Sequence, residues 1–219
     1  PPFFDVPNPD AWRGQYNYPG IELHAAFGDI LRAGMNIAVH GNGDGDIDLI
    51  LAALMKVNEV WDVSGRVRLE HSSLVTADQL DTIKKLGIHT SFLGHHVFYY
   101  GDVFYDQILG SERSERIHPF KTAQNMGVGW DIHSDAPVSP PDPLFEMWSA
   151  INRTTSSGRI LGKEERVSPI EALSACTILP AISLGISEKV GSIEEGKYAD
   201  FNLISSNLNS DLRDTKVLK

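Results

Sequence analysis

The sequence predicts an α/β protein with a parallel sheet and about half the strands of a closed (β/α)8 barrel. Two observations support this prediction. Short strand-like segments alternate along the chain with segments whose apolar residues recur at helical spacing, an order typical of parallel strands covered by helices. Four such strands can be counted in the 219 residues, whereas a closed barrel has eight strands and typically about 250 residues.

The strands are predicted as short strand-like segments that end at or near a polar residue. They are expected at residues 35–39, 66–71, 88–93 and 128–132. Each has about the length of a strand rather than of a helix, which supports the assignment. The sheet would therefore have four parallel members.

The helices are predicted from apolar spacing and from their end signals. Two amphipathic segments span about 21–34 and 47–54. Capping boxes, in which Ser or Thr is followed three residues later by Glu or Gln, open two further helices at Thr76 and Ser168. One more helix is expected over 114–126, where Gly127 would end it.

Three parts of the chain differ in character. Residues 1–20 are rich in proline and aromatic residues and are expected to form an irregular arm. Residues 21–187 carry the alternating strands and helices of a partial barrel. Residues 188–219 contain a glycine-rich segment from Gly191, predicted to form a β-hairpin, followed by a polar tail.

Composition excludes several classes of function. The 29 acidic residues outnumber the 19 basic ones, and the net charge of −10 repels nucleic acid and anionic lipid. No apolar run approaches the roughly 18–20 residues that a membrane span needs, and the first residues do not resemble a signal peptide. The single cysteine, Cys176, favours a reducing compartment, so a cytoplasmic location is expected.

Side chains that can bind metal follow successive predicted strands. His40, His71, the pair His95 and His96, and Asp135 each lie at or just past the carboxyl end of a strand. A single histidine at such a place is more simply explained by packing or by solvation. Four consecutive strand ends with the same kinds of residue indicate a site, because α/β folds place their sites at this edge.

These residue types point to metal-assisted hydrolysis. Imidazole and carboxylate suit a divalent ion, with Zn²⁺ the expected one, and ligands from several strand ends leave a coordination position open for water. The ion would activate water and polarise a carbonyl group, while a nearby carboxylate moves the proton. Asp135 is the candidate for that carboxylate.

Several neighbours have two interpretations. His133 lies two residues before Asp135, and it either binds metal or supports a ligand through its ring N–H, which is the favoured role. Tyr100 belongs to an aromatic cluster beyond His96 that either packs or forms a wall of a substrate site. Glu70 is expected to point to the face opposite His71, as a structural partner.

Four segments together resemble the amidohydrolase superfamily in order and spacing. They are the segments 38–44, 69–72, 133–138 and 191–200. The segments 96–102 and 109–113 strengthen a narrower resemblance to the YtcJ-like branch, which includes N-substituted formamide deformylases. The resemblance covers nearly the whole chain.

The resemblance implies a fold and a set of roles. The four strands would be strands five to eight of the barrel, and the hairpin would belong to a small β-sandwich. His40 and His71 would be metal ligands, and Asp135 would bind metal and shuttle the proton. One or two ions would be bound, and His96, with His95 and Tyr100 beside it, would face a small amide-type substrate.

Members of the family also carry a His-x-His on the first strand and commonly a lysine on the fourth, and neither can be placed in this chain. We therefore expect a truncated chain that forms a homo-oligomer or pairs with a missing N-terminal half. A metal-dependent hydrolase of C–N bonds is the leading hypothesis. The alternatives are a non-catalytic remnant that folds by self-association with at most a weak metal site, and a hydrolase of esters or phosphoesters.

Overall fold

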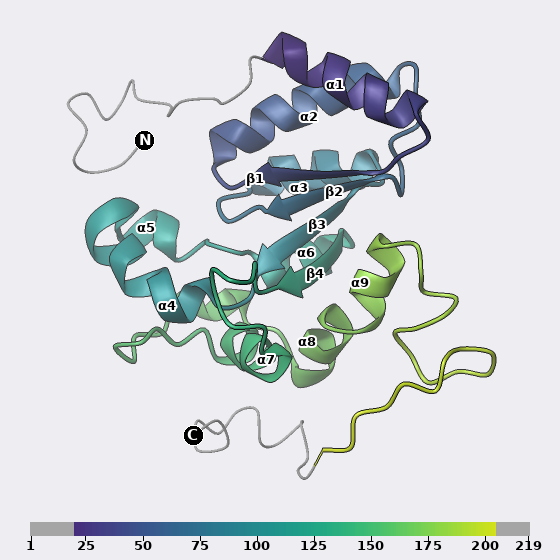
Figure 1. The fold of residues 1–219 in the computed structure, drawn as a ribbon. Helices are drawn as coiled ribbons and strands as arrows, with labels where there is room; N and C mark the ends of the chain where they lie inside the picture. Colours follow the sequence, from purple (N-terminus) through teal and green to yellow (C-terminus); the bar gives the residue numbers. More distant parts are fainter. Residues whose placement is uncertain (1–19, 205–219) are drawn as a thin grey trace.

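A computed structural model of the chain describes residues 20–204. Four parallel strands form one sheet, ordered as they occur in the chain (Figure 1). The strands are β1 (Ile37–Gly41), β2 (Val67–His71), β3 (His89–Leu93) and β4 (Gly129–His133). The predicted α/β class and its parallel sheet are thereby confirmed, and each strand lies within three residues of its expected position.

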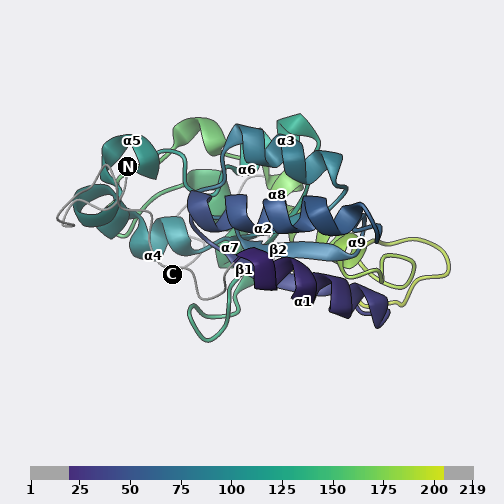
Figure 2. The same cartoon turned by 90° about the horizontal axis from the view of Figure 1, so that it is seen from above.

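Helices connect the strands and extend the chain beyond them. Within the described part they are α1 (Gly20–Arg32), α2 (Asp44–Asn58), α3 (Ala77–Lys85), α4 (His96–Val103), the π-helical η1 (Phe104–Ile108), α5 (Gly110–Ser114), α6 (Phe120–Met126), α7 (Pro143–Asn152), the 3-10 helix η2 (Lys163–Glu165), α8 (Pro169–Ala175) and α9 (Ile178–Ser183). Helices α2 and α3 lie along one side of the sheet (Figure 2). None of the helices in residues 20–204 is long and apolar enough to cross a membrane.

Alternation along the strands separates an apolar face from a polar one. In β4, Trp130 and Ile132 belong to the main hydrophobic core, which also contains Leu54 of α2 and Ile83 of α3. The residues between them point to the other face of the sheet, because successive strand side chains alternate. That other face carries charged and hydroxyl groups and leads to the candidate site.

Both expected capping boxes are present. The Thr76 hydroxyl accepts from the Gln79 N–H while the Gln79 side chain accepts from the Thr76 N–H, and Ser168 and Glu171 form the same pair at α8. Each box satisfies N–H groups that a helix start leaves unpaired. These local signals therefore fix the starts of α3 and α8 as predicted.

The helix expected over 114–126 is interrupted. Helix α5 ends at Ser114 and α6 begins only at Phe120. Between them His118 has a left-handed φ of 47° and is followed by Pro119, which cannot donate a backbone hydrogen bond. The proline was visible in the sequence and opposes a continuous helix.

The hairpin expected from Gly191 forms no strand within the described residues, which end at 204. The Tyr198 N–H donates to the Lys189 carbonyl at 2.8 Å, but no ladder follows there. Ile193 and Phe201 are 84% and 66% exposed. A hairpin needs further strands to cover such side chains, and the described residues supply none. Residues 1–19 of the expected arm and 205–219 of the tail lie outside the described part.

Replacing Glu146 with Gln is expected to change how stability depends on pH. Burial in α7, with the charges of Asp142 and Asp131 nearby, raises the pKa of Glu146 from 4.5 to about 7. The folded protein therefore holds this proton more tightly than the unfolded chain, and the stability of the wild type falls as pH rises from about 4.5 to 7. Glu146→Gln removes that loss and should raise the free energy of unfolding at pH 8 by up to about 3 kcal/mol.

Urea unfolding at pH 4.5 and pH 8 measures this effect. The exposed Glu112→Gln is the matched control, and its stability should follow the wild type at both pH values. Equal stability changes for Glu146→Gln at the two pH values would contradict a raised pKa.

Candidate metal centre

The carboxyl ends of β1 and β2 bring His40 and His71 together. Gly41 at the end of β1 is in register with His71 at the end of β2. The two imidazole centroids lie 4.5 Å apart in an edge-to-face arrangement. His40 is exposed and His71 is buried, so the pair lies at the border between the sheet and solvent.

The backbone at this edge is strained in the way that functional sites often are. His71, Ser72 and Asp135 have left-handed φ angles of 75°, 46° and 54°. Each such angle in a non-glycine residue costs about 1–3 kcal/mol and persists only where the surroundings impose it. Ser72 is held by its N–H to the Gly41 carbonyl at 2.9 Å and by a 2.7 Å hydrogen bond from Thr90 Oγ1 to its hydroxyl.

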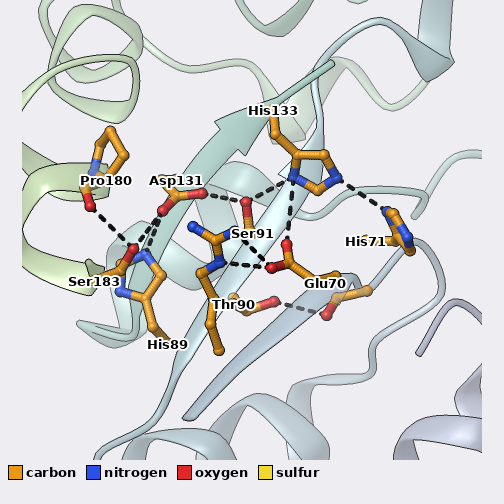
Figure 3. Close-up of polar contacts among 11 residues, drawn as sticks. Glu70, His71, His89, Thr90, Ser91, Asp131, His133, Pro180 and Ser183 are labelled. Atoms are coloured by element: carbon orange, nitrogen blue, oxygen red, sulfur yellow. Dashed lines mark hydrogen bonds and ion pairs between the residues drawn. The ribbon is translucent and has the colours of Figure 1, made fainter. Parts of the chain in front are cut away.

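The left-handed turn at His71 also changes which residues share a face. Strict alternation predicted that Glu70 and His71 point apart. Instead both approach the same ring: His71 Nδ1 lies 3.0 Å from His133 Nε2, and Glu70 Oε2 lies 3.9 Å from His133 Nδ1 (Figure 3). Glu70 is a partner of Arg68, whose guanidinium lies 2.6 Å away, and that part of the expectation holds.

His133 stands behind His71 at the end of β4. Its Nδ1 is 2.7 Å from the Ser91 hydroxyl, and its Nε2 faces the His71 ring. Both ring nitrogens are therefore engaged by protein groups. This placement suits the supporting role favoured from the sequence better than direct ligation.

Burial keeps these histidines neutral at pH 7. Burial, together with the neighbouring His40, lowers the pKa of His71, and burial with the neighbouring His71 lowers that of His133 to about 4. The charge of the Asp135 carboxylate raises the pKa of both His71 and His133, although less than burial lowers it. A neutral imidazole keeps one nitrogen lone pair free, as a metal ligand requires.

His96 and Tyr100 lie together beside this group, and His95 turns away. The buried His96 ring packs against Tyr100, with centroids 4.9 Å apart, and burial lowers its pKa to about 4. His95 Nδ1 instead lies 2.9 Å from the Ser139 hydroxyl, and its ring packs on Phe145. The structure thus gathers His96 and Tyr100 on one side and places His95 in a separate aromatic contact.

His118 is a neighbour that the sequence analysis missed. It is fully buried, its ring centroid is 5.2 Å from that of His96, and neither ring nitrogen has a hydrogen-bond partner in the described part of the chain. It follows α5 rather than a strand. Candidate residues were predicted only at the carboxyl ends of strands, so His118 was not among them. The only signal was an isolated His-Pro pair.

The donors at this edge are of the chemical types that bind a divalent ion. Residues 20–204 contain no preassembled group of three or more His, Cys, Asp or Glu side chains at metal-binding geometry. His71, however, has only Nδ1 engaged by His133, and His40 and Asp135 are exposed beside it. Two imidazoles and a carboxylate are a donor set that catalytic zinc sites use.

Comparison with known proteins shows similarity over nearly the whole chain. The family described as Amidohydro_3, an amidohydrolase family, matches residues 1–216. N-substituted formamide deformylase of Arthrobacter pascens is 30% identical over 206 residues, covering 92% of this chain and 38% of that protein. YtcJ of Bacillus subtilis (strain 168), named as an amidohydrolase, is 28% identical over 196 residues, covering 85% of this chain and 36% of that protein.

A solved structure agrees with these sequence matches. The crystal structure of a metal-dependent hydrolase from Pyrococcus horikoshii OT3 superposes with a TM-score of 0.80 at 26% identity. The match covers 95% of this chain and 41% of that one. The chain therefore spans well under half the length of these relatives.

Proposed function

The chain belongs to the amidohydrolase family, and from this membership we propose that it is part of a metal-dependent hydrolase of C–N bonds other than peptide bonds. Family membership itself supports a hydrolase. The narrower activity, on small amides and N-substituted formamides, is proposed from the similarity to the formamide deformylase of A. pascens. The observation that carries the metal dependence is the pairing of the His40 and His71 rings at 4.5 Å beside the charge of Asp135.

Each residue has a proposed role. His40 and His71 hold a divalent ion, expected to be Zn²⁺, with Asp135 as a third ligand, and the site takes one or two ions. When bound, the ion supplies Lewis-acid chemistry that activates water and polarises the substrate carbonyl. The Asp135 carboxylate accepts the proton of the attacking water and returns it to the leaving nitrogen.

Substrate would be contacted from the side of α4. His96 begins this helix and Tyr100 lies one turn further along, with the two rings in contact. A neutral, buried His96 can donate a hydrogen bond to a polar group of the substrate or accept one from it. The exposed Tyr100 provides an apolar surface beside it. His95, which was expected beside them, contacts Phe145 and the Ser139 hydroxyl instead, and no substrate contact is proposed for it.

We also propose that the sheet is half of a barrel, corresponding to strands five to eight. The sequential parallel order of β1 to β4 and the ligand-type residues at their carboxyl ends support this. Strand β1 has β2 as its one strand neighbour in the described sheet, so its outer edge can pair with another strand. A second copy or an N-terminal half is the proposed partner, and light scattering after gel filtration would measure the mass of the assembly.

Hydrolysis of a small N-substituted formamide tests the proposed activity. Release of formate should depend on metal: a chelator should reduce it to background, and added Zn²⁺ should restore it. The variant His24→Ala, in α1 away from the strand ends, is the matched control and should retain the wild-type rate.

Two outcomes would contradict this proposal. Formate release that survives complete removal of metal would exclude the metal-dependent mechanism. Turnover of an ester or phosphoester without any turnover of amides or formamides would show that the bond class is wrong.

A further inference from the structure

A line of buried polar side chains runs along the polar face of the sheet and ends at His71. It begins at Asp131 in the middle of β4, which is 1% exposed. Three groups surround this carboxylate: the Ser91 hydroxyl donates to Oδ1, the Ser183 hydroxyl donates to Oδ2 at 3.0 Å, and His89 Nε2 lies 3.1 Å from Oδ2 (Figure 3). None of these residues is among the proposed metal ligands or the proposed substrate contacts.

Asp131 determines where the Ser91 proton points. Burial raises the pKa of Asp131, but the contacts with His89 and Ser91 outweigh burial, and the pKa lies below its ordinary value. The group is therefore an ionised carboxylate that can only accept hydrogen bonds. Because Ser91 must donate its single proton to Asp131, its oxygen is left to accept from His133 Nδ1, 2.7 Å away.

The position of the His133 proton in turn fixes the one on His71. A neutral imidazole has one donor nitrogen and one acceptor nitrogen. With the proton of His133 on Nδ1, Nε2 is the acceptor, and it faces His71 Nδ1 at 3.0 Å. His71 must then donate from Nδ1, so its Nε2 carries the free lone pair.

We propose that Asp131 and Ser91 are positioning residues that set the tautomers of His133 and His71, so that His71 offers Nε2 to a metal ion. The part of this inference that concerns metal rests on the proposed function. We call the hydrogen bonds that run from Asp131 through Ser91 and His133 to His71 the relay. Without it each imidazole could adopt either tautomer, and only one tautomer of His71 leaves its Nε2 unprotonated. The relay fixes the tautomer of both rings already in the metal-free protein.

Glu70 does not replace Ser91 as the acceptor. Its nearer oxygen lies 3.9 Å from His133 Nδ1, beyond hydrogen-bond distance. Arg68 holds Glu70 by an ion pair of 2.6 Å and by a 2.7 Å hydrogen bond from Nε. Ser91 is thus the group that links His133 to a fixed negative charge.

Nitrogen-15 NMR of the imidazoles in the metal-free wild type, at pH 7, tests the relay directly. His133 and His71 are expected to carry their protons on Nδ1, with Nε2 unprotonated in both. A proton on Nε2 of either ring, or a doubly protonated His133, would overturn the proposal. This measurement needs neither metal nor activity, so its failure is distinct from failure of the proposed function.

Ser91→Ala tests the consequence for metal. Loss of the acceptor should turn the single tautomer of His133 into a mixture and lower the affinity for Zn²⁺ by about 10–100-fold, as losing the outer partners of metal ligands typically does. Ser149→Ala is the matched control, because Ser149 is equally buried and its hydroxyl has no hydrogen-bond partner among the described residues. Its tautomers and affinity should match the wild type.

Asp131→Asn is a second variant for the case that Ser91→Ala does not fold. Its amide can turn the NH2 group toward Ser91, and the Ser91 hydroxyl then donates to His133 Nδ1. The tautomers of His133 and His71 are thereby reversed. Zn²⁺ affinity should again fall. Unchanged imidazole protonation and affinity in a folded Ser91→Ala or Asp131→Asn protein would overturn the proposal.

Discussion

Asp135→Asn is expected to lower kcat for formamide hydrolysis by about 10²–10⁴-fold, the range that loss of a general base produces. The amide has nearly the shape of the carboxylate, but it cannot accept and return a proton. Asp135 follows the end of β4, is exposed, and has a left-handed φ of 54°. Its negative charge acts on the pKa of His71 and of His133.

Steady-state kinetics with the bound metal measured in the same samples checks this expectation. Asp81→Asn is the matched control, since Asp81 forms an exposed pair with Lys85, and such pairs contribute little. Full activity in Asp135→Asn would remove Asp135 from the mechanism. If the lower rate were explained wholly by lost metal, Asp135 would be a metal ligand but not the proton acceptor.

Arg153→Ala is expected to lower the free energy of unfolding by at least about 3 kcal/mol. Arg153 is fully buried, and its guanidinium donates to the carbonyls of Leu161, His118 and Ile117 at 2.6, 3.1 and 2.8 Å. Each buried acceptor left without a partner costs about 1–3 kcal/mol. Burial lowers the pKa of Arg153 to about 10, so the group is still charged at pH 7.

The same substitution is also expected to alter the position of His118 and, through it, the packing of His96 at the candidate site. Arg153 fixes the backbone of this residue, and the His118 ring packs against His96. Urea unfolding measures the loss of stability, with the exposed Arg32→Ala as control. A loss below about 1 kcal/mol, which is the net worth of a single hydrogen bond, would contradict the role assigned to Arg153.

Local sequence signals were sufficient for the sheet and for two helix starts. Each strand is a short segment whose length distinguishes it from a helix, and each capping box, at Thr76 and at Ser168, has its partner residue three positions later. The grouping of His40 and His71 followed from the same rule, because parallel strands place their carboxyl ends at one edge. The roles of these residues as ligands stay predictions.

Contacts that depend on backbone angles or on distant segments could not be predicted in this way. The left-handed φ of His71 brings Glu70 and His71 to the same ring, and a non-glycine residue gives no sign of such an angle. His118 reaches His96 only through the fold of the segment between α5 and α6. Asp131, by contrast, lies two residues before His133 on one strand, so alternation alone could have placed both on the polar face.

The most direct test of the account is the amount of divalent metal bound per chain, measured by elemental mass spectrometry on protein purified without chelator. We expect one or two ions per chain in the wild type and in His24→Ala, and a loss of metal in His71→Ala. Metal at background in the wild type, or an unchanged content in His71→Ala, would contradict a metal centre at the ends of β1, β2 and β4.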